Sequence, residues 1–321
     1  ISDFVRNTLS EWGSPGGVSV VVVRKTDLDS SRGGHDGLGW VVETKGYGNA
    51  DLAGKVPITD SSLFSIGSNS KLVTAIATGL LISNESLTPR ITWKTKLGSL
   101  IPEWQLVDPI AHQESTILDA LSHRTGLLRH DLAYNKDDSI QTLFKRLRNL
   151  KPSASFRDIW QYNNIMYCAV SYLPSKLLPS HIPFARYVKE HLFDKLQMHD
   201  TTYSYDEVQA TGRLVSGLAR EHVDPANPFA PGITRVTPYW ITTGGEDGNF
   251  MAGAGGVISS GKDLAIWLQM LLLGGVHPST NETIVPEAVL DTISTGYSIP
   301  MGRRSVHHLR TAQSPTLTSH K

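Results

Sequence analysis

The sequence lacks the features that most directly identify a nucleic-acid-binding, membrane or disulfide-stabilised protein. Its single cysteine, Cys168, cannot form an internal disulfide or anchor a cysteine-rich metal site. The 30 Lys and Arg residues balance the 30 Asp and Glu residues, so the formal net charge is zero and no basic surface for a phosphate backbone is expected. No apolar run approaches the roughly 20 residues that a membrane-spanning helix needs. We therefore expect neither a nucleic-acid partner nor a membrane span.

The chain of 321 residues is otherwise ordinary globular material, 40% hydrophobic and long enough to bury a sizeable core. It begins at Ile1 without a methionine or a signal-like apolar segment, which we expect of a processed form or a fragment. The N-x-S/T sequons at Asn84 and Asn281 are about as many as chance provides, so they favour secretion only slightly and leave the compartment open. The apolar residues around Cys168 predict a buried, inert thiol.

The order of the predicted elements indicates an α+β fold, an antiparallel sheet flanked by helices, because strands come first and helices follow. A β-branched run at 18–23 predicts a buried strand, and 40–47 predicts its hairpin partner across a solvated loop at 27–37. The stretch 211–250 is rich in Pro and Gly and has no clear period, so we interpret it as irregular loops around a pocket. Helices are predicted at 3–12, 71–82, 117–121, 139–148, 165–175, 182–192 and 261–273.

A Ser-x-x-Lys pattern, Ser68 to Lys71, opens an apolar helical run directly after Gly67. Residues i and i+3 share one face of a helix, so Ser68 and Lys71 can touch. At a helix N-terminus the free N–H groups and the helix dipole stabilise an alkoxide or an oxyanion. A neighbouring amine that takes the hydroxyl proton turns a serine into a nucleophile. The alternative is a structural one, in which Ser68 caps the helix and Lys71 is merely solvated.

The same pattern occurs a second time, in the segment Ser259-Ser260-Gly261-Lys262, also at a predicted helix start. There Ser260 and Asp263 fit a capping box, in which the two side chains satisfy backbone donors. We interpret this second copy as structural. The bare pattern therefore does not identify a nucleophile by itself.

Four segments of the chain form a series that is more specific than any one of them. They are LFSIGSNSK from residue 63, ALSHRTGL from 120, YNN from 162 and GAGGVISSGKDL from 253. In this order they resemble the serine β-lactamase-related and penicillin-binding-protein-like family, in its class C β-lactamase and esterase branch. The resemblance covers positions 15 to about 295. It implies one domain of the β-lactamase/transpeptidase fold, with an α/β lobe from 1–65 and about 240–300, a helical lobe from about 66–240, and an irregular tail at 301–321.

The resemblance also implies a role for each matching residue. Ser68 would be the acylated nucleophile and Lys71 its proton partner, and Tyr162 would pass a proton to the leaving group. Asn164 would help to hold Lys71 and the carbonyl side of the substrate. The substrate would be a small molecule with an ester, amide or β-lactam carbonyl, and the site would need no cofactor and no metal. From the residues alone, Tyr162 could also be a core aromatic with a satisfied hydroxyl.

Three further features are interpreted as structural or left open. The resemblance implies that His123 is a packing and turn residue, and no G-x-S-x-G nucleophile elbow is present beside it to favour a catalytic triad. The glycines in 253–256 lack the Lys and Ser/Thr ending of a phosphate loop, so they predict a tight turn. Trp160 and Trp240 fit pocket walls and core positions equally well.

One part of the family pattern is absent from this sequence. The family completes its site with a K-T-G or H-x-G motif on a strand near its C-terminus, yet after position 200 no glycine follows a Lys, His or Arg by two residues. We therefore expect the final strands to be missing from this chain. Such a loss would leave the first hairpin with an unpaired edge, through which the chain could form oligomers, and would make the activity weak. The alternative function is a non-catalytic binding protein of the same fold.

Overall fold

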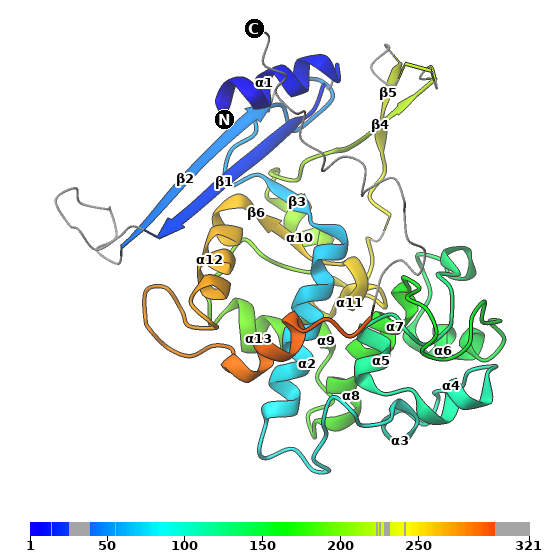
Figure 1. Cartoon of the computed structure of the whole chain (residues 1–321). Coiled ribbons are helices and arrows are strands. Elements are labelled where there is room, and N and C mark those ends of the chain that lie inside the picture. Colours follow the sequence, from blue (N-terminus) through cyan, green and yellow to red (C-terminus); the bar gives the residue numbers. More distant parts are fainter. Residues whose placement is uncertain are drawn as a thin grey trace, which may run out of the picture.

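The computed structural model describes residues 1–298 of the chain, except 14, 26–38, 55, 223, 225, 228–231 and 241. The loop expected at 27–37 and the tail expected at 301–321 lie outside the described residues. The described elements form the α+β fold that the sequence predicts, with small antiparallel sheets beside a body of helices (Figure 1). The division into two lobes at about residues 66 and 240 stays a prediction.

The N-terminal hairpin forms where the sequence predicts it but is less buried than expected. β1 (Gly17–Lys25) pairs antiparallel with β2 (Trp40–Gly48), and α1 (Ser2–Glu11) packs against β2 (Figure 1). Every residue of β1 is at least partly exposed, so the expectation of a buried strand is wrong. The reason is that β1 has one strand partner in the described part of the chain, β2, and is otherwise covered by the helix α12 (Gly261–Leu272).

The helices expected from the sequence are present, with small shifts at their ends. The two expected at 165–175 and 182–192 are each divided, the second into α9 and a π-helical turn at Lys189–Phe193. The other helices not yet given are α2 (Ser70–Ser83), α3 (Leu97–Leu100), α4 (Pro109–Glu114), α5 (Ile117–Leu121), α6 (Ile140–Leu147), α7 (Asn164–Ser171), α8 (Leu173–Leu177), α9 (Phe184–Val188), α10 (Tyr205–Ala210), α11 (Ala252–Gly255) and α13 (Glu287–Ser294).

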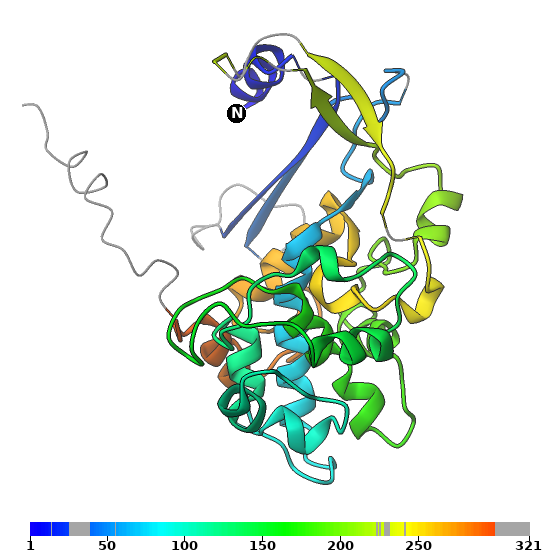
Figure 2. The same cartoon turned by 90° about the vertical axis from the view of Figure 1, so that its right-hand side faces the viewer.

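The helix α2 runs through the middle of the helical body (Figures 1 and 2). Its run LVTAIATGLLI is apolar on nearly every side, which is typical of a helix that is covered all round. Helices α7, α9, α11 and α13 all pack against it. At Gly79 the helix α13 comes so close that a Cβ atom would overlap the side chain of Val289. The absence of a side chain at this position therefore sets the distance between the two helices.

A second hairpin is a correction to the expected loops at 211–250. β4 (Gly217–Glu221) and β5 (Ile233–Thr237) pair antiparallel within this stretch, so that expectation is wrong for these residues. Each strand has only five residues among Pro and Gly, which is too short for a clear alternating signal. Figure 2 shows the hairpin reaching the level of α1, where Arg220 donates a hydrogen bond to the carbonyl of Trp12 (2.7 Å).

The third strand pair connects distant parts of the chain. β3 (Leu63–Ser65) pairs antiparallel with β6 (Ile258–Ser260), and beyond it the Ile66 N–H donates to the Val257 carbonyl (3.1 Å). This pairing brings the segment before α2 next to the glycines in 253–256. Most of those glycines belong to the short helix α11, so the expected tight turn is wrong there.

Most of the buried apolar side chains form one cluster within the helical body. Cys168 lies inside it and is fully buried, as the sequence predicts. Burial raises the pKa of its thiol to about 12, so the reactive thiolate is suppressed at neutral pH. In the described part of the chain, no helix combines the length and the apolar character that crossing a membrane requires.

Candidate active site

Ser68 lies in the short connection between β3 and α2. The chain leaves β3, passes through a 3-10 turn (Gly67–Asn69) and enters α2. Gly67 has a φ of 51°, which glycine adopts without strain. The Ser70 hydroxyl holds this turn in place, because it donates to the Gly67 carbonyl (2.7 Å) and accepts from the Val257 N–H (3.0 Å). Ser68 is thereby held on the surface at the start of α2.

The Lys71 side chain turns inward, so its ammonium group is buried while Ser68 stays exposed. Only 7% of Lys71 is exposed. Its Nζ donates to Ser68 Oγ (3.2 Å), to Asn164 Oδ1 (2.8 Å) and to the Ala254 carbonyl (2.6 Å). A lysine ammonium has three N–H groups, so each has an acceptor. The i, i+3 contact expected between Ser68 and Lys71 is present.

Tyr162 contacts Ser68 from the other side. Its hydroxyl oxygen lies 2.5 Å from Ser68 Oγ. Lys71 Nζ is 4.7 Å from the centroid of its ring, and Arg129 Cζ is 4.9 Å from the same point. The phenol is thus directed at the serine, and two positively charged groups lie close to its ring. A proton on Ser68 Oγ, on the Tyr162 hydroxyl or on Lys71 Nζ therefore has a hydrogen-bonded neighbour to which it can move.

Asn164, the first residue of α7, connects Lys71 to a second set of polar groups. Its Oδ1 accepts from Lys71, while its Nδ2 donates to Asp131 Oδ1 (3.1 Å) and to the Tyr134 hydroxyl (3.3 Å). Asp131 also accepts from the Tyr134 hydroxyl (2.7 Å) and from Arg129 Nε (2.6 Å). Burial alone would raise the pKa of Asp131, but the hydrogen bonds from Tyr134 and Arg129 lower it overall. A charged Asp131 therefore orients the amide so that its oxygen faces Lys71.

His123 touches the same tyrosine ring but uses its nitrogen elsewhere. Its Nδ1 accepts from the Asn163 backbone N–H (3.1 Å), and its ring packs against Trp160 and Tyr162. Burial, helped by the charge of Lys71, lowers the pKa of His123 to about 4, so the imidazole is neutral near pH 7. This geometry fits the packing and turn role expected for His123, which has a φ of 59°.

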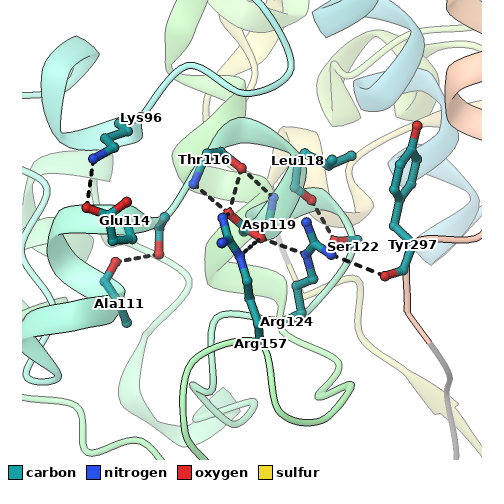
Figure 3. Close-up of polar contacts among 11 residues, drawn as sticks. Lys96, Ala111, Glu114, Thr116, Leu118, Asp119, Ser122, Arg124, Arg157 and Tyr297 are labelled. Carbon is teal, nitrogen blue, oxygen red and sulfur yellow. Dashed lines mark hydrogen bonds and ion pairs between the residues drawn. The ribbon is translucent and has the colours of Figure 1, made fainter.

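A buried carboxylate on α5 organises the loops beside the site, and sequence reasoning missed it. Asp119 is fully buried and accepts hydrogen bonds from Arg124 Nε (2.6 Å) and from two nitrogens of Arg157 (both 2.8 Å), as Figure 3 shows. Thr116 adds its N–H (3.0 Å) and its hydroxyl (2.6 Å). Burial alone would raise the pKa of Asp119, but the hydrogen bonds from Arg157 and Thr116 lower it overall.

These arginines tie the loop after α5 to the segment before α7, which carries Tyr162. The Arg157 N–H donates to the Arg124 carbonyl (2.8 Å), and the Gln161 N–H donates to the His123 carbonyl (2.8 Å). The residue after Gln161 is Tyr162, so the position of the phenol depends on this loop pairing. The sequence does carry one local signal for Asp119, a T-x-x-D capping pattern from Thr116, whereas Arg157 lies 38 residues away.

An open cleft of about 760 Å³ leads to Ser68. Its lining residues are Ser68, Leu128, Arg129, Trp160, Gln161 and Tyr162. Trp160 is therefore a wall of this cleft, whereas Trp240 lines a different cavity, of about 520 Å³, at the base of the β4–β5 hairpin. Among the described residues, no group of three or more His, Cys, Asp or Glu side chains is arranged to hold a metal ion.

The second Ser-x-x-Lys copy lies elsewhere and has different contacts. The Ser259 hydroxyl is buried and lies 2.8 Å from the Thr201 hydroxyl. The Ser260 hydroxyl accepts from the Asp263 N–H (3.2 Å), so Ser260 caps α12 as expected. The Asp263 carboxylate instead accepts from the Asp200 N–H (2.7 Å) and the Thr201 hydroxyl (2.8 Å), so the expected capping box is only half formed. Lys262 is exposed.

Comparison with known proteins gives one family and a consistent set of relatives. Residues 13–297 match the family model described as Beta-lactamase. The unguisins hydrolase ungD' of Aspergillus campestris is 31% identical over 277 residues, which cover 84% of this chain and 46% of that protein. The chain thus spans less than half the length of this curated relative.

Two solved structures show the same fold at lower identity. The octameric penicillin-binding protein homologue from Pyrococcus abyssi superposes with a TM-score of 0.69 at 18% identity, over 92% of this chain and 59% of that one. The class C beta lactamase from Rhodobacter sphaeroides superposes with a TM-score of 0.62 at 21% identity, over 91% of this chain and 69% of that one.

Proposed function

The chain belongs to the β-lactamase family, and on that premise we propose that it is a serine hydrolase that works through an acyl-enzyme on Ser68. The family and the fold expected from the four sequence segments are confirmed. The observation that carries the proposal is the three-way contact at the cleft. Ser68 Oγ lies within hydrogen-bond distance of both Lys71 Nζ (3.2 Å) and the Tyr162 hydroxyl (2.5 Å).

In the first half of the reaction, Ser68 Oγ attacks the carbonyl carbon of an ester, an amide or a β-lactam. Its proton moves along the short hydrogen bond to the phenolate form of Tyr162, whose negative charge the buried Lys71 ammonium stabilises. The tetrahedral intermediate then collapses, and the bond from carbon to the leaving group breaks. Tyr162 gives its proton to the leaving oxygen or nitrogen, and the acyl group stays on Ser68.

In the second half, a water molecule takes the place of the leaving group. Tyr162 removes a proton from this water as its oxygen attacks the acyl carbon, and then returns a proton to Ser68 Oγ as the acid is released. Asn164 serves both halves, because its amide oxygen accepts from Lys71 while Asp131 and Tyr134 fix its nitrogen. Lys71 therefore keeps its position through the change of charge on Tyr162.

A relative that is named as a hydrolase supports a catalytic role over a purely binding one. The test is the intact mass of the chain after incubation with an activated ester and, separately, with a β-lactam. We expect a covalent adduct with either reagent, located on Ser68 by peptide mapping. A chain that binds these reagents reversibly and never gains mass would contradict the proposal and favour the non-catalytic binding protein.

A further inference from the structure

The cleft at Ser68 has one charged side chain among its six lining residues, Arg129. This side chain is 58% exposed, so a solute that enters the cleft can reach it. The same cleft has apolar surface from Leu128 and Trp160 and the hydroxyl pair of Ser68 and Tyr162. Cation, apolar wall and candidate nucleophile therefore face one space.

The guanidinium of Arg129 is held by one edge only. Its Nε donates to Asp131 Oδ2 (2.6 Å), and its Cζ lies 4.9 Å from the centroid of the Tyr162 ring. Within the described part of the chain, its two terminal nitrogens make no hydrogen bond to protein. Asp131 is shared, because it also accepts from Tyr134 and Asn164. The group is thus oriented by the protein while its remaining N–H donors stay available.

We propose that Arg129 binds a carboxylate of the substrate, so that this site acts on acyl compounds that carry an anionic group. A carboxylate is the acceptor that matches the parallel N–H groups of a guanidinium. Arg129 lies over the same tyrosine ring whose hydroxyl contacts Ser68. A carboxylate bound by Arg129 therefore lies a few bonds from the reacting carbonyl, with an apolar spacer against Leu128 and Trp160. The inference rests on the proposed function of Ser68.

The kinetic test compares two activated esters that differ in one charge, the mono-p-nitrophenyl ester of glutaric acid and the methyl ester of that compound. We expect Arg129→Gln to lower kcat/KM for the anionic ester by about 10- to 100-fold more than for the neutral ester, mainly through KM. The neutral ester reports the part of the loss that passes through Tyr162 and Asp131. Arg129→Lys should restore part of the loss, because it keeps the charge without the planar fork. Arg148→Gln, which removes an exposed arginine of α6's C-terminus, is the control for net charge.

An equal loss on both esters would overturn the inference, since it would mean that Arg129 acts on Tyr162 alone. No loss on either ester would overturn it as well.

A binding test separates this inference from the proposed function. In Ser68→Ala, which cannot form an acyl-enzyme, calorimetry with the monoanilide of glutaric acid and its methyl ester measures recognition without chemistry. We expect the anion to bind about 10-fold more tightly, and Ser68→Ala/Arg129→Gln to remove that difference. Equal affinities in Ser68→Ala, or a preference that survives the second substitution, would overturn the inference. If wild-type chain is never acylated but the preference is found, the proposed function fails while the anion site stands.

Discussion

Ser68 and Ser259 each stand three residues before a lysine, yet their surroundings differ in almost every respect. Ser68 is exposed beside a cleft, and its lysine turns inward to three acceptors. Ser259 is buried against Thr201, and its lysine, Lys262, points to solvent. In the second copy the buried charged group is Asp263, which accepts from the Thr201 hydroxyl (2.8 Å).

The strand pairing explains the difference. The two serines are close in the fold, because Ser259 lies on β6 and pairs with Phe64 on β3, a few residues before Ser68. β6 runs straight into α12, so Ser259 remains in the sheet. Between β3 and α2 the chain inserts the turn at Gly67, which lifts Ser68 out of the sheet and towards the cleft. A four-residue pattern becomes a candidate site only where the preceding turn exposes the serine and the helix buries the lysine.

Removing each serine hydroxyl in turn shows which of the two serines reacts. Ser68→Ala should remove all covalent labelling by an activated ester and change the free energy of unfolding by less than about 1 kcal/mol, because the side chain is exposed. Ser259→Ala should keep full labelling. The measurement is intact mass together with denaturant unfolding of each variant. Labelling that survives Ser68→Ala and vanishes in Ser259→Ala would reverse the assignment.

The next largest effect concerns the proton partners that only the first copy has. Tyr162→Phe should lower the turnover of an activated ester by about 10²- to 10⁴-fold with little change in stability. Lys71→Ala should be similarly damaging, because both residues serve one proton transfer. Steady-state kinetics of these variants, with Lys262→Ala as the matched control, checks this. Normal turnover in Tyr162→Phe would mean that the Tyr162 ring only packs and that its hydroxyl takes no part in proton transfer.

Asp119 stabilises the loops that hold Tyr162 beside Ser68. Asp119→Asn leaves two arginines beside a neutral side chain and should lower the free energy of unfolding by about 3 kcal/mol. The folded pKa of Asp119 is lowered, so its contribution is complete above the ordinary carboxyl pKa and is lost as the pH falls through the lower folded value. Urea unfolding against pH should therefore show a shallower acid decline in Asp119→Asn than in wild type.

Asp158→Asn, at the exposed position directly after Arg157, is the control for Asp119→Asn. Equal stabilities and equal acid slopes in wild type and Asp119→Asn would mean that the contacts of Asp119 with Arg124 and Arg157, drawn in Figure 3, contribute nothing to the free energy of unfolding.

The smallest effect is expected at the cap of the second copy. Ser260→Ala removes the acceptor of the Asp263 N–H and should cost about 1 kcal/mol of stability. Labelling and turnover should stay at the wild-type level, because the hydroxyl has a structural task. A thermal melt and an ester assay on the same sample measure both. A stable variant with lost turnover would give this copy a part in the chemistry.

The sequence predicts those features whose signal is local or carried by motif order. α2 follows from an apolar run, and the meeting of Ser68, Lys71 and Tyr162 follows from the order of the four segments. Arg129 has no such signal, because its place in the cleft depends on how the loop after α5 folds back on α7. The β4–β5 hairpin is missed for a different reason. Its two strands are close in the sequence, but each is too short to show an alternating pattern.

The close approach of α13 to Gly79 has a consequence for how this chain tolerates genetic change. Gly79 lies about three turns along α2 from Ser68, on a face where even a methyl group would push α13 away. The residues after α13 are tied to the loops of the site, because the Tyr297 carbonyl accepts from Arg124 and the Ser298 hydroxyl donates to the Ser122 carbonyl. A screen for heat-sensitive alleles should therefore find them at Gly79, a codon that no inspection of the catalytic groups would select.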